Sequence, residues 1–310
     1  MTMTGSWSRW FAVGIVACTI AVGVPPYVSA QQPTTSVERP LEAKPEDKGP
    51  NTGRISLNFG VDWASAYYFR GIAQEQSGAN FQPSGSLSFK LIENAGPLTA
   101  LTATPGFWNN WHAGGGTIVD PADPTFWYES DLIFTLAATL WENVTVGLVY
   151  TAYTSPNDSF KSVQELAFSV SLNDSKWLGE FALNPSLLVA GEVKGQADAG
   201  SARGVYLQLG INPGYTLAPK SDYPLTISLP VTLGLSGHKY YEFGTTKNPA
   251  FGYVQVGPVF SVPLAFIPKS FGTWTVKGAA EFLFLGETLK PLNDNDVFKP
   301  IGRIGIAAVY

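Results

Sequence analysis

The sequence is poor in several of the residue types on which protein chemistry commonly depends. It has one cysteine, Cys18, and two histidines among 310 residues, and only 14% of its residues are charged. A single cysteine excludes an intramolecular disulfide framework. The net charge of -5 and the lack of a basic cluster argue against a nucleic-acid partner. After the first thirty residues no apolar run approaches the about 20 residues that a transmembrane helix requires.

The N-terminal residues 1–30 are predicted to be a signal peptide. Arg9 precedes an apolar run over residues 10–24, and Val28-Ser29-Ala30 offers a small-residue cleavage site. Cleavage there would remove Cys18 and leave a mature chain without a thiol. A lipoprotein signal is the alternative, because the residues before Cys18 are also compatible with one.

The next segment, residues 31–53, is rich in Pro, Glu and Lys and has no apolar periodicity. We interpret it as a disordered periplasmic tail. From about Ile55 onward, twelve stretches alternate apolar and polar residues, most clearly over 225–235. A period of two predicts strands and excludes helices. The predicted strands cover residues 54–69, 81–91, 98–111, 126–138, 143–153, 162–173, 182–193, 204–217, 225–236, 251–264, 274–285 and 301–310.

The connections between these strands alternate between short and long, which is typical of an outer-membrane barrel with tight periplasmic turns and longer external loops. We therefore predict that residues 54–310 form an all-β, antiparallel, up-and-down transmembrane barrel of about twelve strands. A soluble β-sandwich would also alternate and is the alternative. Five prolines inside the predicted strands favour that alternative unless bulges absorb them; they are Pro105, Pro185, Pro213, Pro230 and Pro258.

The aromatic residues and the last strand support a membrane location. Aromatic residues cluster near predicted strand ends, as in Trp108 and Trp111, and would form girdles at the lipid headgroups. Residues 301–310 alternate up to the terminal Tyr310, and we expect this strand to close the sheet against the first one. The expected partners are the lipid bilayer of a Gram-negative outer membrane and, during assembly, its insertion machinery.

The segment Ser65–Gly71, SAYYFRG, followed by Ile72-Ala73-Gln74, resembles the opening motif of the TorF-like family of porins from Gram-negative bacteria. In that family an early strand reads Ser, any residue, Tyr, any residue, Phe, Arg, Gly and leads into a polar loop. Ala66 stands where the family has an acidic residue. The resemblance covers about thirty residues and implies an outer-membrane barrel, with no established substrate and no catalytic residues.

Strand periodicity assigns ten charged side chains to the lumen, since charges facing lipid would be costly. Acids slightly outnumber bases, which predicts a porin or small-solute channel with a weak preference for cations. A non-conducting structural or adhesion barrel, in which these charges pair with one another, is the alternative. The predicted lumen residues are Asp62, Arg70, Lys90, Glu129, Asp131, Glu165, Glu192, Lys277, Glu281 and Arg303.

A third hypothesis is a surface hydrolase, because His112 and His238 both fall at predicted outer strand ends. Ser236 and His238 would share one face of a strand, but spacing cannot establish a catalytic triad. The sequence contains no glycine-rich phosphate-binding loop and no metal-ligand cluster. We therefore expect no enzymatic activity, no cofactor and no metal.

Overall fold

The structure is a computed structural model that describes residues 53–76, 78–112, 126–198, 200, 202–243 and 249–310. The predicted signal peptide, residues 1–30, lies outside the described residues, as do residues 31–52 of the predicted tail. The described part of the chain includes no helix long and apolar enough to span a membrane.

Strands dominate the described residues, and the helical elements are short turns. The strands are β1 (Ile55–Ala64), β2 (Tyr67–Phe69), β3 (Ile72–Glu75), β4 (Asn80–Ala95), β5 (Leu98–His112), β6 (Trp127–Leu140), β7 (Val144–Thr154), β8 (Val163–Leu172), β9 (Ser186–Lys194), β10 (Val205–Ile211), β11 (Gly214–Leu217), β12 (Leu225–Ser228), β13 (Val231–His238), β14 (Phe251–Val256), β15 (Val259–Pro263), β16 (Thr273–Leu285) and β17 (Phe298–Val309). The helical turns are α1 (Ser175–Leu178), η1 (Gly179–Phe181), η2 (Lys269–Phe271) and η3 (Glu287–Leu292).

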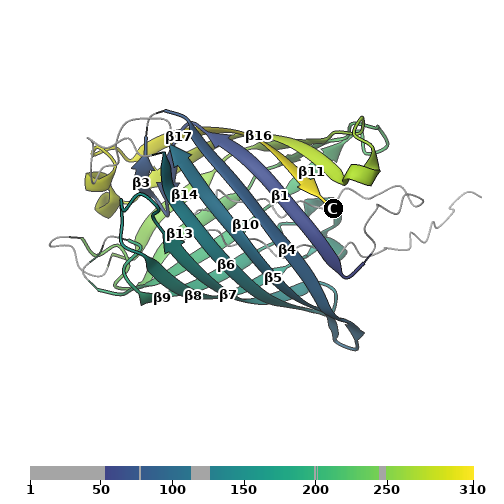
Figure 1. Ribbon diagram of the computed structural model, residues 1–310, viewed down its shortest axis with the longest axis horizontal. Helices are drawn as coiled ribbons and strands as arrows, with labels where there is room; N and C mark the ends of the chain where they lie inside the picture. The colour runs from purple at the N-terminus through teal and green to yellow at the C-terminus, as the bar shows by residue number, and fades with distance from the viewer. Residues whose placement is uncertain (1–52, 77, 113–125, 199, 201, 244–248) are drawn as a thin grey trace, which may run out of the picture.

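These strands form one closed antiparallel barrel with twelve wall positions (Figure 1). β10 with β11, β12 with β13, and β14 with β15 each make one interrupted wall strand, and the other nine positions are continuous. The last strand closes the barrel because β17 pairs with both β16 and β1. Leu57 and Tyr310 also exchange backbone hydrogen bonds of 2.8 Å at this seam. The predicted barrel fold and its closure by the last strand are confirmed.

The prolines account for the three interrupted wall strands. Pro213, Pro230 and Pro258 lie in the breaks between the paired segments, where a residue without an N–H donor is tolerated. Pro105 remains inside β5, opposite Phe134. Pro185 directly precedes β9, so this strand begins later than the predicted residue 182. The prolines therefore interrupt the hydrogen-bond ladders between strands without opening the barrel. Because the sheet closes on itself through β17, the β-sandwich alternative is wrong.

Loop lengths do not alternate as strictly as the sequence predicted. The connection over residues 173–185, which contains α1 and η1, is longer than the one over residues 155–162 at the other end of the barrel. We call the end of the barrel that carries β2 and β3 the hairpin end, and the end at which β1 begins and β17 finishes the terminal end.

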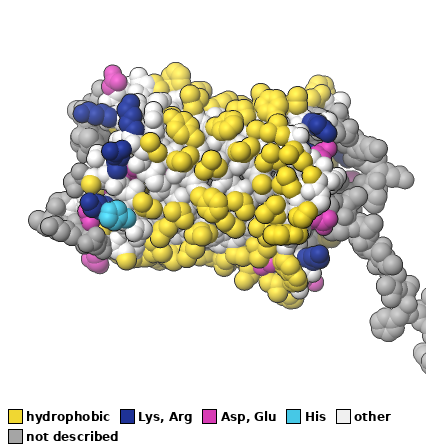
Figure 2. Space-filling view, turned by 90° about the horizontal axis from the view of Figure 1, so that it is seen from below, with side chains coloured by type: hydrophobic (Ala, Val, Ile, Leu, Met, Phe, Trp, Pro, Cys, Tyr) yellow, Lys and Arg dark blue, Asp and Glu magenta, His cyan; other side chains and the backbone are white. Residues whose placement is uncertain are grey.

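The outer surface carries a broad apolar band, with charged side chains gathered toward both ends (Figure 2). Along β6, Leu132 and Phe134 are 63% and 48% exposed, whereas Ile133 between them and Thr135 after them face inward and are 6% and 5% exposed. A barrel that exposes large apolar side chains along its wall matches a lipid environment, in which outward residues are apolar and inward residues polar.

Lysine substitutions at two neighbouring positions on β6 test which face of this strand contacts lipid. Phe134→Lys is expected to destabilise the folded barrel in a bilayer by about 2–4 kcal/mol, because it places a charge against lipid. Thr135→Lys places the same charge on the inner wall and is expected to cost much less. Equilibrium unfolding in lipid vesicles measures both, and equal losses would contradict the membrane orientation.

The first wall strand differs from its predicted extent of residues 54–69, because β1 leaves the wall after Ala64. The following residues form β2 and β3, a separate two-stranded hairpin that is not paired to the barrel wall. Its side chains contact inner-wall residues of several strands, so the β2–β3 hairpin lies inside the hairpin end of the barrel. The site described next is built around it.

Candidate functional site

The turn of the β2–β3 hairpin has a backbone that favours glycine at one position. Arg70 and Gly71 both have positive φ, 47° and 84°. A Cβ atom on Gly71 would lie 2.7 Å from Cδ1 of Leu289 in η3, so only glycine fits here without displacement. The Asn293 amide donates a hydrogen bond of 2.9 Å to the Gly71 carbonyl, and the Tyr241 hydroxyl donates one of 3.0 Å to the Arg70 carbonyl. Loops far along the chain thus hold the turn.

The Arg70 side chain is buried at the centre of the site. Its two terminal nitrogens donate hydrogen bonds of 2.7 Å to both carboxylate oxygens of Glu165 on β8, a bidentate ion pair. Nη1 also donates to the Tyr240 hydroxyl at 2.9 Å, and the guanidinium lies 4.0 Å from the ring centroid of Tyr206. The Arg70 and Glu165 side chains are only 5% and 1% exposed, so each charge depends on the other for compensation.

The rest of the hairpin is tied to β5 and β6. The Tyr67 hydroxyl donates to the Glu129 carboxylate, and the Tyr128 hydroxyl donates to Gln74. The Glu75 carboxylate lies 3.3 Å from Nδ1 of His112. The hairpin therefore contacts one arc of the inner wall, through β5, β6 and β8, which lie close together in the sheet order.

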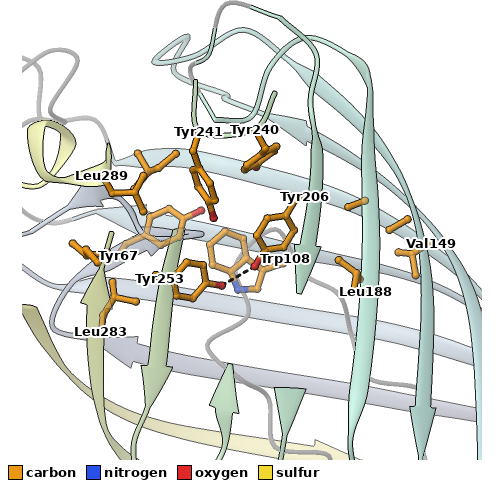
Figure 3. Close-up of a cluster of buried hydrophobic side chains, with 14 of the residues drawn as sticks. Tyr67, Trp108, Val149, Leu188, Tyr206, Tyr240, Tyr241, Tyr253, Leu283 and Leu289 are labelled. Atoms are coloured by element: carbon orange, nitrogen blue, oxygen red, sulfur yellow. Dashed lines mark hydrogen bonds between the residues drawn. The ribbon is translucent and has the colours of Figure 1, made fainter. Parts of the chain in front are cut away.

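Tyrosines fill much of the remaining space beside the hairpin (Figure 3). Tyr206 and Tyr253 share a hydrogen bond of 2.8 Å between their hydroxyls. Tyr240 and Tyr241, from the connection after β13, pack edge to face with ring centroids 4.8 Å apart. All four tyrosines are at most 3% exposed. The hairpin end of the barrel is therefore a packed core.

A second charged group lies beside a small cavity at this end. Arg303 on β17 donates to Glu281 at 3.3 Å and to Gln82 at 2.5 Å, and Gln255 donates to Glu281 at 3.0 Å. The cavity beside these groups, also lined by Arg70, has a volume of about 10 Å³, enough for roughly one water molecule.

Carboxylates also order the connection between β9 and β10. Glu192 accepts backbone hydrogen bonds from Ala197 at 2.5 Å and Gly204 at 2.6 Å. Asp198 accepts one of 2.8 Å from the Tyr241 backbone N–H, and burial raises the pKa of the Asp198 carboxyl above its usual value. This loop carboxylate links the connection after β9 to the Tyr240–Tyr241 segment that contacts Arg70.

Among the described residues, no basic side chain forms an ion pair with Glu129 or Asp131, two acids of the inner wall in this region. Both are on β6, and they are 4% and 0% exposed. Glu129 lies opposite Asn110 in the ladder, and Asp131 lies opposite Trp108. Neither Asp131 carboxylate oxygen has a hydrogen-bond donor, and the same is true of the Asn110 side chain, which is fully buried.

Toward the terminal end the inner wall changes character. Its inward side chains there are small and mostly polar, and several hydrogen-bond to one another across strands, as Thr104 does to Ser88 at 3.1 Å and Thr216 to Thr226 at 3.0 Å. The polar inward positions of this region include Ser86, Ser88, Thr102, Thr104, Thr135, Ser228 and Thr232. The tyrosine-rich part of the packed core lies at the hairpin end, and Val149, Ala167, Leu188 and Ala190 extend this core along the wall.

The ten predicted lumen residues fall into three groups. Arg70 is the correction: it lies in the hairpin turn inside the lumen and not on a wall strand, because the chain leaves the wall after Ala64. Lys90 pairs with Glu93 at 2.6 Å near the terminal end. The side chains of Asp62, Glu129, Asp131, Glu165, Glu192, Lys277, Glu281 and Arg303 occupy positions on wall strands whose alternation points them inward.

Sequence reasoning missed the polar partners of these charges. Nothing in the sequence around Glu75, Tyr240 or Asn110 indicates that these residues contact the charged side chains. The only local signal was the Arg70-Gly71 pair, since an Arg-Gly step before a polar segment is compatible with a turn. Partners from β5, β8 and the connection after β13 had no signal in the sequence.

The two histidines do not assemble the elements of a hydrolase among the described residues. His112 is buried, contacts Glu75, and stacks on Tyr128 with ring centroids 4.5 Å apart. His238 ends β13 and is exposed. In the described part of the chain neither histidine has a hydrogen bond to a serine hydroxyl, and no group of three or more His, Cys, Asp or Glu side chains could hold a metal ion.

No protein-family model matches the sequence, and no curated protein matches it. Among solved structures, the NanC porin is 14% identical, with a TM-score of 0.42, over 81% of this chain and 98% of its own. The COG4313 outer membrane channel from Pseudomonas putida F1 is 14% identical, with a TM-score of 0.45, over 87% and 100%. The translocator domain of the autotransporter NalP from Neisseria meningitidis is 13% identical, with a TM-score of 0.37, over 83% and 89%. The barrel fold of this chain rests on its own strand pairing, independently of these likenesses.

Proposed function

We propose that the chain is an outer-membrane channel of a Gram-negative bacterium that passes small solutes with a preference for cations. In this proposal the β2–β3 hairpin narrows the channel at the hairpin end. The apolar band on the outer wall supports a bilayer location, with insertion by the outer-membrane assembly machinery. The TorF-like resemblance of Ser65–Gly71 agrees with this proposal and stays a prediction.

The lining of the terminal end is the observation that carries the proposal. A barrel of about eight strands has an interior that side chains can just fill. This barrel has twelve wall positions, and its terminal end is lined by small, mostly polar side chains such as Thr104, Thr135 and Thr232. In this proposal the small polar side chains line the path of the solute, a role that a purely structural barrel does not need.

The charges support a preference for cations. Six of the ten charged positions assigned to the lumen are acidic, and the two arginines among them are engaged by Glu165 and Glu281. Within the described part of the chain, the Glu129 and Asp131 carboxylates form no ion pair with a basic side chain. Rings or clusters of acidic side chains favour cations in channel lumens.

Planar-bilayer recordings in a salt gradient test the proposal. We expect the wild-type protein to conduct, with a reversal potential that indicates cation preference. Thr135→Lys adds a positive charge to the inner wall and should shift the reversal potential toward anions. Thr135→Gln, which adds length without charge, is the control and should leave it unchanged. A wild-type lumen that prefers anions would contradict the proposal.

A non-conducting structural barrel is the second candidate function. The observation that favours it is the buried Arg70–Glu165 pair, which fastens the hairpin inside the lumen. In that case no current is expected in the wild type, whose lumen the fastened hairpin closes. The two candidates are therefore separated by the wild-type recording, with which the hairpin deletion is compared in the Discussion.

A further inference from the structure

We propose that Glu129, Asp131 and Asn110 form a binding site for a hard divalent cation of the Ca²⁺ class, inside the lumen and directly beneath the β2–β3 hairpin. The site would add ion binding to the proposed channel. It rests on the proposed function only because the ion must reach it through the lumen from the terminal end. Its binding can be measured without any current, so the two proposals can fail separately.

The first argument is uncompensated charge. Glu129 and Asp131 are two residues apart on β6, so their carboxyl groups share the inward face of the strand, and each is at most 4% exposed. The nearby guanidinium of Arg70 is already bidentate to Glu165. Two neighbouring buried carboxyl groups are stabilised either by a positive partner or by a shared proton, because isolated buried charges are strongly unfavourable. A divalent cation carries the two positive charges that neutralise both carboxylates.

The second argument is the unused hydrogen-bonding capacity around the acids. Both oxygens of Asp131 and both polar atoms of the Asn110 side chain lack partners, although both residues are fully buried. Buried polar side chains in folded proteins are ordinarily satisfied, so an orphaned group indicates a missing water or ion. Asn110 stands directly opposite Glu129 on the same face of the ladder. Its side-chain amide therefore lies on the same inward face as the two carboxylates.

The donor set fits the chemistry of a hard cation. Ca²⁺ is bound by six to eight oxygen ligands from carboxylates, amide carbonyls and water. Glu129 and Asp131 supply up to four carboxylate oxygens, and Asn110 adds an amide oxygen. The Tyr67 hydroxyl holds one Glu129 oxygen in place from the hairpin side. Water from the polar terminal end can complete the shell.

Terbium luminescence provides a local test, because Tb³⁺ substitutes for Ca²⁺ and emits when a nearby tryptophan is excited. Trp108 lies opposite Asp131 in the ladder. We expect saturable Tb³⁺ emission from the full-length protein in detergent, displaced by Ca²⁺. Asp131→Asn should abolish the saturable component, and Trp108→Phe should reduce emission while leaving the Ca²⁺ affinity unchanged. Asp62→Asn, on β1 and three wall strands away, is the matched control and should bind as the wild type does.

Thermal unfolding supplies a second readout that does not depend on luminescence. Ca²⁺ should raise the melting temperature of the wild type and of Asp62→Asn, with a shift that grows with the logarithm of its concentration. Asp131→Asn and Asn110→Ala should show no shift or a smaller one. Without metal, Asp131→Asn should be at least as stable as the wild type, since it removes a repulsive carboxylate.

The alternative is that one proton is shared between Glu129 and Asp131. In that case Ca²⁺ would not raise the melting temperature of the wild type, and Asp131→Asn would not change Tb³⁺ emission. Either result overturns the cation site, whether or not the barrel conducts.

Discussion

Replacing Arg70 by glutamate is expected to release the β2–β3 hairpin from the lumen without dismantling the barrel. The change places a carboxylate against Glu165, in a pair whose side chains are 5% and 1% exposed. Breaking a buried ion pair from one side costs about 3–5 kcal/mol. The wall strands pair independently of this contact, so the loss falls on docking of the hairpin.

Two measurements on Arg70→Glu distinguish the roles of this residue. We expect a lower melting temperature and a higher single-channel conductance, because the hairpin no longer narrows the lumen. Arg203→Glu, at an exposed arginine whose Nη1 donates to the Val193 carbonyl at 2.6 Å, is the control and should change neither. The charge-swapped double variant Arg70→Glu, Glu165→Arg should recover part of the stability. An Arg70→Glu protein unchanged in both measurements would refute the structural role of this ion pair.

Deleting the hairpin is expected to give the largest rise in conductance. Ala64 and Asn80 are already paired across β1 and β4, so excision of residues 66–76 leaves Ser65 and residues 77–79 as a four-residue connection. Loops of this length commonly join antiparallel strands. The tyrosine core would lose its central element, and the polar lining of the terminal end would become continuous with the opposite mouth.

Single-channel recording compares this deletion with the wild type. A conductance several-fold above that of the wild type supports a channel narrowed by the hairpin. A control deletion of residues 220–221, in the exposed turn between β11 and β12, should leave conductance unchanged. Silence of the wild type would instead favour the structural barrel.

The wall of the barrel could be predicted from the sequence because its signal is local. Alternation over residues 225–235 places one face toward lipid and the other inward, and a slip of one residue would reverse every side chain. Even the break at Pro230 follows from a local property, the missing N–H donor. Strands that follow one another in the chain can then pair, because the connections between them bring them side by side.

The hairpin could not be predicted in this way. Periodicity extended the first strand to Phe69, although the chain leaves the wall after Ala64. The contacts that hold Arg70 come from residues 95 and 170 positions away in the sequence, Glu165 and Tyr240. Nothing local distinguishes a segment that continues a strand from one that turns inward to meet such partners.

The sequence by itself determined the closed antiparallel wall and the apolar outer face of its strands, because a period of two encodes which face each residue occupies. Only the tertiary structure decided how the inward charges are used. Closure of the barrel pairs Arg70 with Glu165 and brings Asn110 of β5 opposite Glu129 of β6. Which buried charges find a partner depends on three-dimensional proximity across strands, and that proximity is absent from the linear pattern.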